Sequence, residues 1–326
     1  MMAAKTRALI CGVSGQDGAY LAKFLVGKGY EVFGTSRDAE LSSFANLRQL
    51  GVLDRVHRRS MSLMDFRSVL TVLSEVQPSE IYNLAGQSSV GLSFEQPVET
   101  MESICMGTLN LLEAVRFLGK GIKLYNASSS ECFGDTGDHP ADEQTPFKPR
   151  SPYAVAKSAA HWTVANYRDA YGLFACNGIL FNHESPLRPP RFVTRKIVRA
   201  ACAIKLGQEQ SLRLGNLGIC RDWGSAEEYV DAMWRMLQFD RAEDFVIATG
   251  QTSSLQEFVK AAFDAVDLDW SRHVEFDNAL TRPSETSFSA GNAAKASDAL
   301  GWQAKSQMRD VVRMMVDQEL ASMSIG

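Results

Sequence analysis

The sequence has no long basic run, and no apolar run near the ~18–20 residues that a membrane-spanning helix needs. Its 34 lysine and arginine residues stand against 38 aspartate and glutamate residues, a formal net charge of −4. The electrostatic surface of a nucleic-acid-binding protein is therefore not expected. Residues 1–7 contain no signal-peptide core. We expect a cytoplasmic protein that has neither a nucleic acid nor a membrane as its partner.

Cysteine and histidine are also sparse, with six and five residues among 326. No two cysteines form a C-x-x-C motif, and most of them stand within apolar segments. The histidines show no H-E-x-x-H or similar spacing typical of metal ligands. We expect reduced cysteines that pack as small apolar side chains, and no metal site.

What the sequence does contain is an alternation of short apolar runs with longer amphipathic ones over its first 182 residues. The apolar runs predict strands over residues 7–11, 31–36, 55–60, 80–84, 122–127 and 174–181. The amphipathic segments predict helices over residues 18–28, 65–73, 98–118 and 153–171. Strands that alternate with helices indicate a parallel sheet with helices on both faces.

The pattern changes after Asn182. A loop-rich segment precedes short strands near residue 212 and over 245–248, and helices near 193–206, 226–237, 255–265, 293–300 and 308–320. The predicted fold class is α/β, a Rossmann-type doubly wound parallel sheet with a smaller C-terminal α/β lobe. We expect residues 1–182 to bind the cofactor and residues 183–326 mainly to bind the substrate, with some later elements folding back onto the first lobe. Ligands of such sheets bind outside the carboxyl ends of the strands.

A G-x-x-G-x-x-G motif follows the first predicted strand, with glycines at positions 12, 15 and 18. Glycines there allow a tight turn and let the backbone approach a pyrophosphate at the N-terminus of the next helix. A glycine triplet alone is a weak signal. Its place between the first strand and the first helix makes it typical of a dinucleotide-binding site.

The end of the second predicted strand indicates which dinucleotide binds. Enzymes that use NAD usually carry an acidic residue there for the ribose 2′-hydroxyl. This chain has Ser36 followed by Arg37. A guanidinium group pairs well with phosphate, so the sequence predicts NADP as the cofactor. Asp38 could neutralise Arg37, and the sequence leaves that alternative open.

A Y-x-x-x-K spacing opens the helix predicted over residues 153–171. Tyr153 and Lys157 are four residues apart, so both side chains lie on one face of that helix. A free tyrosine has a pKa near ~10, which a nearby lysine and a nicotinamide cation should lower. We expect Tyr153 to take a proton from a sugar hydroxyl as hydride leaves the same carbon.

Three serines and a glutamate, residues 128–131, follow the fifth predicted strand. The hydroxyl of Ser129 or Ser130 could bond the oxygen that is being oxidised. Glu131 is more informative, because a plain alcohol dehydrogenase needs no carboxylate at this point. An enzyme that removes a proton beside a ketone does need one.

With these residues placed, the chain resembles the GDP-mannose 4,6-dehydratases over nearly its whole length. The most specific matches are the FNHESP segment and the RSPY-x-x-x-K block. The matching segments are GVSGQDGAYLAKFLVGKGYEVFG, EIYNLAGQSSV, ASSSECFG, TPFKPRSPYAVAK, NGILFNHESPLR, FVTRKI, LRLGN, RDWG, YVDAMWRMLQ and EDFVIATG.

The resemblance implies a hydro-lyase that converts GDP-D-mannose to GDP-4-keto-6-deoxy-D-mannose and water, with the hydride recycled on bound NADP. Tyr153 would take the proton of the 4-hydroxyl, and Lys157 would hold the nicotinamide ribose. Ser129, which stands where the family has threonine, would bond the C4 oxygen. Glu131 would remove the C5 proton and help water leave from C6.

Motifs and resemblance together also imply the remaining contacts and a homodimer or homotetramer. The expected cofactor-binding residues are Gly12, Val13, Ser14, Gly15, Gln16, Asp17, Gly18, Arg37, Ser62, Leu63, Leu84, Ala85, Gly86, Gln87, Ser88, Lys157, His183 and Arg188. The expected residues for GDP-mannose or a closely related GDP-sugar are Ser88, Asn182, Glu184, Val193, Lys196, Leu214, Gly215, Asn216, Arg221, Arg282 and Glu285.

Two alternatives stay open. A related GDP-sugar dehydratase, reductase or epimerase of the same fold would keep Tyr153 and Lys157, and some relatives keep an acid at Glu131 without dehydrating. A non-catalytic NADP-sensing module would keep the glycine motif. Such proteins tend to lose the tyrosine–lysine pair, which this chain retains.

Overall fold

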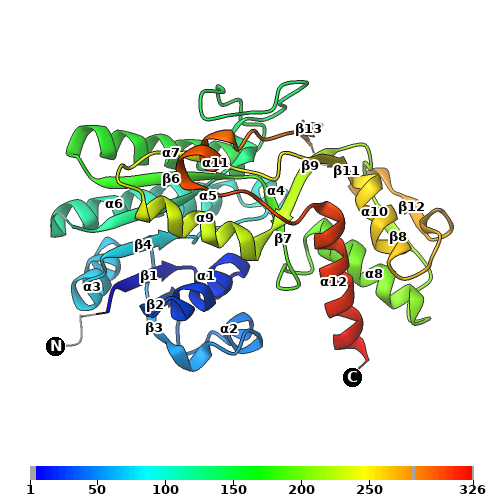
Figure 1. The fold of residues 1–326 in the computed structure, drawn as a ribbon, viewed down its shortest axis with the longest axis horizontal. Helices are drawn as coiled ribbons and strands as arrows, with labels where there is room; N and C mark the ends of the chain where they lie inside the picture. The colour runs from blue at the N-terminus through cyan, green and yellow to red at the C-terminus, as the bar shows by residue number, and fades with distance from the viewer. Residues whose placement is uncertain (1–4, 120, 281–282, 325–326) are drawn as a thin grey trace.

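The computed structural model describes residues 5–119, 121–280 and 283–324, and its larger part is a sheet covered by helices on both faces (Figure 1). The strands of this sheet are β1 (Arg7–Cys11), β2 (Glu31–Ser36), β3 (Val56–Ser60), β4 (Glu80–Asn83), β5 (Lys123–Ser129), β6 (Phe174–Leu180) and β10 (Phe245–Ile247). They lie in the order β10-β6-β5-β4-β1-β2-β3, and all neighbours are parallel. The predicted Rossmann-type α/β fold is confirmed.

The first strand contributes to two apolar cores, one on each face of the sheet. Ala8 and Ile10 pack into one core, whereas Leu9 and Cys11 pack into the other. Successive side chains of a strand point to opposite faces, so an apolar strand in a parallel sheet is buried on both sides. The helices of the first core are α1 (Gln16–Gly27) and α9 (Ala226–Gln238), and those of the second are α3 (Phe66–Val76), α6 (Gly107–Leu118) and α7 (Pro152–Tyr171).

The large sheet is not confined to the first 182 residues. Strand β10 comes much later in the chain, yet it pairs with β6 at the edge of the sheet. Its three residues are apolar and fully buried. Helix α9 packs against α1 on the same sheet. The second half of the sequence therefore completes the sheet as well as forming its own lobe.

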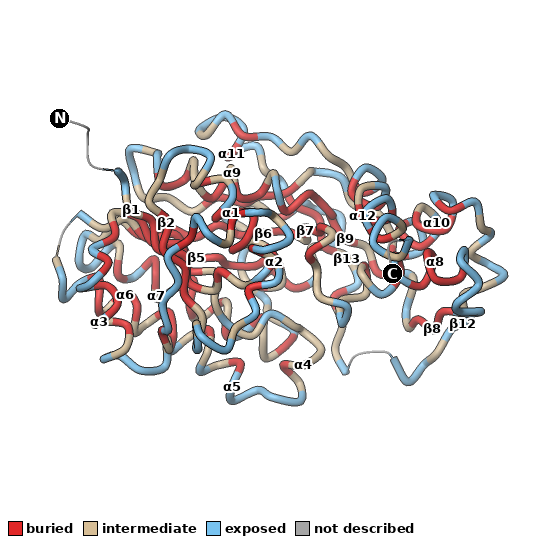
Figure 2. Tube along the Cα trace, turned by 90° about the horizontal axis from the view of Figure 1, so that it is seen from below, coloured by how far each residue is buried: buried red, intermediate tan, exposed pale blue. Residues whose placement is uncertain are grey.

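The smaller lobe has a separate apolar core formed by α8 (Val193–Lys205), α10 (Leu255–Asp264) and α12 (Met308–Met323). Figure 2 shows these buried segments at the end of the molecule away from the N-terminus. Its strands are β7 (Asn182–Glu184), β8 (Leu212–Leu214), β9 (Cys220–Ser225), β11 (Thr252–Ser254), β12 (Val274–Phe276) and β13 (Phe288–Ser289). Strand β9 pairs with β7, β11 and β13, and β8 pairs with β12. The sequence pattern predicted the three helices and a strand near residue 212 but missed the other strands. Most of these have only two or three residues, too few to show alternation, and the six residues of β9 do not alternate between apolar and polar.

The prediction of one continuous helix over residues 98–118 is wrong. The segment is divided into α5 (Pro97–Met101), a π-helical turn η2 (Glu102–Met106) and α6. The wider turn directs the hydroxyl of Ser103 toward the loop after β4, where it accepts a 3.2 Å hydrogen bond from the backbone N–H of Gln87. Apolar periodicity does not reveal such a turn, because the apolar face continues through it.

The remaining short elements connect these layers. They are α2 (Ala45–Gln49), α4 (Val90–Glu95), α11 (Ala294–Leu300), η1 (Leu53–Arg55), η3 (Ser130–Cys132), η4 (Trp270–Arg272) and η5 (Asn278–Leu280). In the part of the chain that the structure describes, no helix has the length and apolar character needed to cross a bilayer.

Candidate active site

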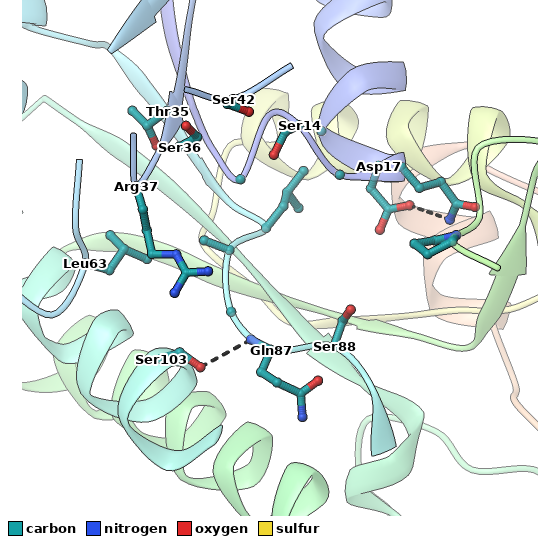
Figure 3. Close-up of a pocket in the computed structure, with 18 of the residues that line it drawn as sticks. Ser14, Asp17, Thr35, Ser36, Arg37, Ser42, Leu63, Gln87, Ser88 and Ser103 are labelled. Carbon is teal, nitrogen blue, oxygen red and sulfur yellow. Dashed lines mark hydrogen bonds between the residues drawn. The ribbon is translucent and has the colours of Figure 1, made fainter. Parts of the chain in front are cut away.

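A cavity of about 900 Å³ opens at the carboxyl ends of β3, β2, β1 and β4 (Figure 3). This is the edge at which ligands of open α/β sheets bind. Most of the residues predicted to bind the cofactor line it, namely Gly12, Ser14, Gly15, Gln16, Asp17, Gly18, Arg37, Ser62, Leu63, Leu84, Ala85, Gly86, Gln87, Ser88 and Arg188. Val13, Lys157 and His183 lie outside this lining; Val13 is fully buried behind the glycine loop.

Other residues of the cavity were missed by the sequence analysis. They are Thr35, Leu41, Ser42, Met61, Met64, Leu92, Gln96, Glu99, Glu102, Ser103, Pro189, Arg191 and Phe192. Proximity to predicted residues at the strand ends could have identified Thr35 and Met61. The residues between 92 and 103 carry no motif, and only the packing of α4, α5 and η2 brings them to the cavity.

The glycine loop packs so closely against neighbouring backbone that two of its positions have little or no room for a side chain. Gly12 has a φ of +84°, and a Cβ atom there would lie 3.0 Å from both the Cα of Ala85 and the carbonyl oxygen of Leu84. A Cβ atom at Gly18 would collide with the carbonyl oxygen of Gly12. Helix α1 begins at Gln16, so its first backbone N–H groups lie at the cavity. The loop therefore fits the pyrophosphate of a dinucleotide.

Asp17 ties the glycine loop to β7. Its Oδ2 atom lies 2.9 Å from Nε2 of His183, and the neighbouring Gln16 side chain donates to the carbonyl oxygen of His183 at 3.2 Å. Burial by itself would raise the pKa of Asp17, but the attraction and hydrogen bond of His183, with the charge of Arg188, hold that pKa well below its ordinary value. The same pairing raises the pKa of His183 against the effect of burial.

The end of β2 presents a cation to the cavity. Figure 3 shows Arg37 reaching into it, and 88% of this side chain is exposed. Among the described residues Arg37 pairs with Glu99, its Nη1 atom 3.9 Å from the carboxylate. Oδ1 of Asp38 instead accepts two hydrogen bonds, 2.9 and 3.0 Å long, from backbone N–H groups of its own loop. A pair as exposed as Arg37 and Glu99 is weak, so the guanidinium can exchange it for an anion.

The hydroxyl and the carboxylate predicted to act in catalysis lie at the end of β5. The chain turns there through η3, and Oγ of Ser129 accepts a 3.2 Å hydrogen bond from the backbone N–H of Glu131. Of the two serines considered, Ser129 is the one that influences Tyr153, because its hydroxyl acts to lower the pKa of the phenol. Ser130 is buried within the turn.

The N-terminus of α7 brings the phenol and the ammonium to the same place. The hydroxyl of Ser151 caps the helix by accepting a 3.1 Å hydrogen bond from the backbone N–H of Ala154. Tyr153 therefore lies in the first turn, and Lys157 lies one turn later. Nζ of Lys157 is 5.9 Å from the centre of the Tyr153 ring and donates to the carbonyl oxygen of Ala127 at 2.7 Å.

Burial dominates the protonation of this pair. It raises the pKa of Tyr153 well above its ordinary value; the hydrogen bond of Ser129 and the charge of Arg188 oppose this, whereas the charge of Glu131 adds to it. Burial also lowers the pKa of Lys157 to about 8. The expectation that the protein's own charges lower the pKa of Tyr153 is therefore wrong. Desolvation of the phenol raises that pKa by more than those charges lower it.

Two of the residues predicted to bind substrate lie in β7, which pairs with β9. Asn182 is half-buried, whereas Glu184 is buried and accepts hydrogen bonds from Arg188 at 2.7 Å and from Thr194 at 2.8 Å. Arg221 in β9 is buried, and its Nη1 atom donates to a backbone carbonyl at 2.8 Å. These strands thus connect the cofactor side of the site with the smaller lobe.

The other predicted substrate residues are spread around the smaller lobe. Lys196 is exposed and donates to the carbonyl oxygen of Arg213 at 2.7 Å, and Oδ1 of Asn216 accepts from the backbone N–H of Gly218 at 2.9 Å. Ser88 lines the 900 Å³ cavity. The remaining described ones are Val193, Leu214, Gly215 and Glu285, of which Leu214 is buried. Arg282 lies outside the described residues.

Comparison with known proteins adds independent findings. Residues 9–315 match the family model described as GDP-mannose 4,6 dehydratase. The chain is 48% identical to GDP-mannose 4,6 dehydratase 1 of Arabidopsis thaliana, over 96% of this chain and 89% of that protein. Among solved structures, DesIV, a dTDP-glucose 4,6-dehydratase from Streptomyces venezuelae with NAD and TYD bound, superposes with a TM-score of 0.86 at 21% identity, covering 98% of each chain. RMD from Pseudomonas aeruginosa complexed with NADPH gives 0.80 at 22% identity, also covering 98% of each chain.

Proposed function

The chain belongs to the GDP-mannose 4,6-dehydratase family, and from that premise we propose that Ser129, Glu131, Tyr153 and Lys157 carry out its chemistry. The protein is a hydro-lyase that converts GDP-D-mannose to GDP-4-keto-6-deoxy-D-mannose and water, with a nicotinamide cofactor. One observation carries the assignment of residues. The hydroxyl of Ser129 accepts a hydrogen bond from the backbone N–H of Glu131, and both Ser129 and Glu131 influence the pKa of Tyr153, so alcohol, phenol and carboxylate lie close together.

NADP is the proposed form of the cofactor. The proposal is supported by the exposed guanidinium of Arg37 at the end of β2, which suits a 2′-phosphate, and by the absence of an acidic residue at Ser36. The glycine loop would hold the pyrophosphate at the N-terminus of α1. When bound, the nicotinamide would supply a positively charged hydride acceptor that later returns the hydride.

Tyr153 would act on the 4-hydroxyl of the mannose. Its pKa is raised by burial, so positive charge nearby is needed to ionise the phenol to the phenolate that accepts the proton, and Arg188 contributes part of that charge. Ser129 would donate a hydrogen bond to the C4 oxygen and keep it in place. Lys157, anchored on the carbonyl oxygen of Ala127, would bond the nicotinamide ribose.

Glu131 would carry the step that distinguishes a dehydratase. A ketone at C4 makes the proton on C5 acidic, and Glu131 would remove it and pass a proton to the C6 hydroxyl, which leaves as water. The backbone hydrogen bond to Ser129 would keep the carboxylate near the sugar. The GDP-sugar would be held by Asn182, Glu184 and Arg221 between β7 and β9, together with Ser88, Val193, Lys196, Leu214, Gly215, Asn216, Arg282 and Glu285. In this assignment residues 1–182 hold mainly the cofactor and residues 183–326 mainly the substrate.

A mass and redox balance tests the activity. Incubation with GDP-mannose and a catalytic amount of NADP⁺ should give a product lighter by one water, with no net change in NADPH. In a parallel reaction supplied with NADPH, its stoichiometric consumption would indicate a reductase, and a product of unchanged mass would indicate an epimerase. NADP binding without turnover of any GDP-sugar would indicate a sensing module.

A homodimer or homotetramer is proposed as the assembly. The support is a set of exposed apolar side chains on the outer face of α5 and α7, including Val98, Val155 and Trp162, which are 69%, 45% and 61% exposed. Trp162→Glu should shift the protein toward monomer in light scattering; an unchanged molar mass would contradict this interface. A cytoplasmic location is also proposed, and it is supported by six free cysteines.

A further inference from the structure

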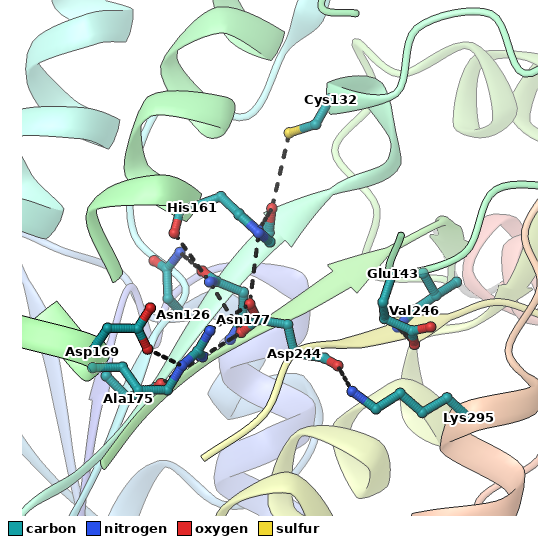
Figure 4. Close-up of polar contacts among 12 residues, drawn as sticks. Asn126, Cys132, Glu143, His161, Asp169, Ala175, Asn177, Asp244, Val246 and Lys295 are labelled. Atoms are coloured by element: carbon teal, nitrogen blue, oxygen red, sulfur yellow. Dashed lines mark hydrogen bonds and ion pairs between the residues drawn. The ribbon is translucent and has the colours of Figure 1, made fainter. Parts of the chain in front are cut away.

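Three polar side chains on one face of α7 fasten this helix to the sheet. Lys157, His161 and Arg168 are spaced so that all three face β5 and β6. Arg168 binds the carboxylate of Asp244 through Nη1 and Nη2, at 2.8 and 3.0 Å. Between the other two, Nδ1 of His161 lies 3.3 Å from Oγ of Ser128 (Figure 4). The mechanism above uses Lys157 but gives His161 no role.

The surroundings of His161 determine how it bonds Ser128. The imidazole is 5% exposed, and burial lowers its pKa, so the ring is neutral. Its Nε2 atom faces Oδ2 of Asp244 at 3.7 Å, which favours the proton on Nε2. Nδ1 is then an acceptor, and the hydroxyl of Ser128 donates to it.

Three hydrogen-bonded asparagines lie next to His161 and Asp244. Asn83, Asn126 and Asn177 are register partners on β4, β5 and β6. Their side chains are joined by hydrogen bonds of 3.0 and 2.9 Å, and Asn177 donates at 3.2 Å to the carbonyl oxygen of His161 and to Asp244. These asparagines therefore fix Asp244 and the backbone of His161, and the imidazole lies between Asp244 and Ser128.

Ser128 connects this network with the reacting groups. Its Oγ atom lies 3.9 Å from Sγ of Cys132 (Figure 4). That sulfur lies 3.9 Å from the carbonyl oxygen of Ala154. Cys132 follows Glu131 in η3, and Ala154 follows Tyr153 in α7. The Ser128 hydroxyl thus lies between the helix that carries the proposed base and the turn that carries the proposed carboxylate.

We propose that His161 is a positioning residue, which acts through Ser128 to fix the distance of Tyr153 from Ser129 and Glu131. The inference rests on the proposed function, because those three groups are the ones assigned to the dehydratase reaction. His161 itself touches none of the reacting atoms. Its effect follows from geometry, since a displacement of about 1 Å at a reacting group can cost about a hundredfold in rate.

Substitution of His161 tests the proposal, because a positioning role should change the rate of hydride removal from C4 more than it changes substrate binding. His161→Phe keeps a ring of similar size but removes both nitrogens. We expect kcat to fall by about tenfold to a hundredfold, while KM for GDP-mannose changes by less than about twofold. GDP-mannose carrying deuterium at C4 should show a larger isotope effect on kcat in the variant, because hydride removal from C4 becomes slower. A purely structural role would lower kcat through the fraction of folded enzyme, with KM unchanged, but it would leave the isotope effect unchanged, so the isotope effect decides between the two roles.

Two further substitutions separate the Nδ1 contact from the bulk of the ring. His161→Asn places an acceptor near the position of Nδ1 and should restore most of kcat, whereas His161→Gln extends past it and should not. Ser128→Ala removes the hydroxyl that donates to Nδ1 of His161 and should reproduce the loss of kcat expected for His161→Phe. It keeps the proposal testable if His161→Phe folds poorly. The double variant should be no slower than either single variant, because both disrupt one contact.

A matched control lies on the same helix. Tyr167→Phe removes a hydrogen bond of 2.5 Å to Glu113, at a distance from the site, and should lower thermal stability without lowering kcat. The positioning role is overturned if His161→Phe keeps its kcat, if kcat and KM change in proportion, or if the Asn and Gln variants behave alike. If the unsubstituted protein releases no water from GDP-mannose, the proposed function fails first, and that outcome is distinct from all of these.

Discussion

Nε2 of His183 lies 2.9 Å from Oδ2 of Asp17, so a residue of the glycine loop is paired with a residue that follows the sixth strand of the sheet. The two positions are 166 residues apart in the sequence. The pair joins the loop that would hold the pyrophosphate to the strand that would hold the sugar. Loss of this pair should therefore lower both the free energy of unfolding and the affinity for the cofactor.

The Asp17–His183 pair should make stability depend on pH. The pKa of His183 is raised, so its contribution is complete below the unfolded value near 6.5 and is lost as pH rises through the folded value. The pKa of Asp17 is lowered, so its contribution is complete above the unfolded value near 3.8 and is lost as pH falls. Asp17→Asn should cost roughly 2–3 kcal/mol of unfolding free energy between about pH 4 and 6.5. Denaturant titrations should show a smaller cost at pH 8.5; an equal cost at all pH values would contradict the charge pairing.

Replacement of the phenol should remove turnover and leave binding. Tyr153→Phe deletes one hydroxyl, so kcat should fall by about a hundredfold to ten-thousandfold. Dissociation constants for NADP and for GDP-mannose, measured by calorimetry, should change by less than about threefold. A large loss of affinity with little change in kcat would argue against Tyr153 as the base.

Replacement of the carboxylate should stop the reaction at a different point. Glu131→Gln keeps the shape and the backbone hydrogen bond to Ser129, so both ligands should still bind. Removal of hydride from C4 does not need Glu131, so reduced nicotinamide should appear in a single turnover. Loss of water should fall by at least about a hundredfold. Retained dehydration, measured by product mass, would remove Glu131 from the mechanism.

Replacement of Lys157 should separate stability from activity. Burial lowers its pKa to about 8 from 10.5, so at neutral pH the folded protein carries a buried ammonium that costs stability. Lys157→Met should therefore be inactive and at least as stable as the unsubstituted protein at pH 7. The advantage of the variant should shrink as pH rises from about 8 to about 10.5, because the unsubstituted lysine becomes neutral in the folded state. Parallel unfolding curves at pH 7 and 9.5 check this. A variant that is clearly less stable at pH 7 would show that the 2.7 Å bond to Ala127 outweighs the burial cost.

The preference for NADP should depend on one exposed cation. Arg37→Ala should weaken NADP binding by about tenfold or more, because a phosphate–guanidinium contact is lost, and should leave NAD binding nearly unchanged. Glu99→Gln serves as the opposite change, since it removes the partner of Arg37 and should strengthen NADP binding. Fluorescence titration of the unsubstituted protein and both variants with each dinucleotide measures the six dissociation constants. Equal losses for NADP and NAD in Arg37→Ala would contradict the assignment of Arg37 to the 2′-phosphate.

The sequence by itself determined the layered fold and the position of the glycine loop. Both depend on local patterns: apolar runs that become buried strands, and the spaced glycines at 12, 15 and 18, of which Gly18 leaves no room for a side chain and Gly12 has a positive φ. The helical spacing of Tyr153 and Lys157 was equally visible, because residues four apart share a face whatever surrounds them. The family resemblance rested on the same local segments.

Only the tertiary structure decided the electrostatics and the long-range contacts of the site. Local spacing predicted a lowered phenol pKa, but burial raises it, and burial is a property of the packed molecule. The π-helical turn η2, the return of β10 to the large sheet and the contact of His161 with Ser128 join residues that no local pattern relates. A sequence pattern records which face of an element is apolar, whereas desolvation and side-chain contact depend on which elements pack together.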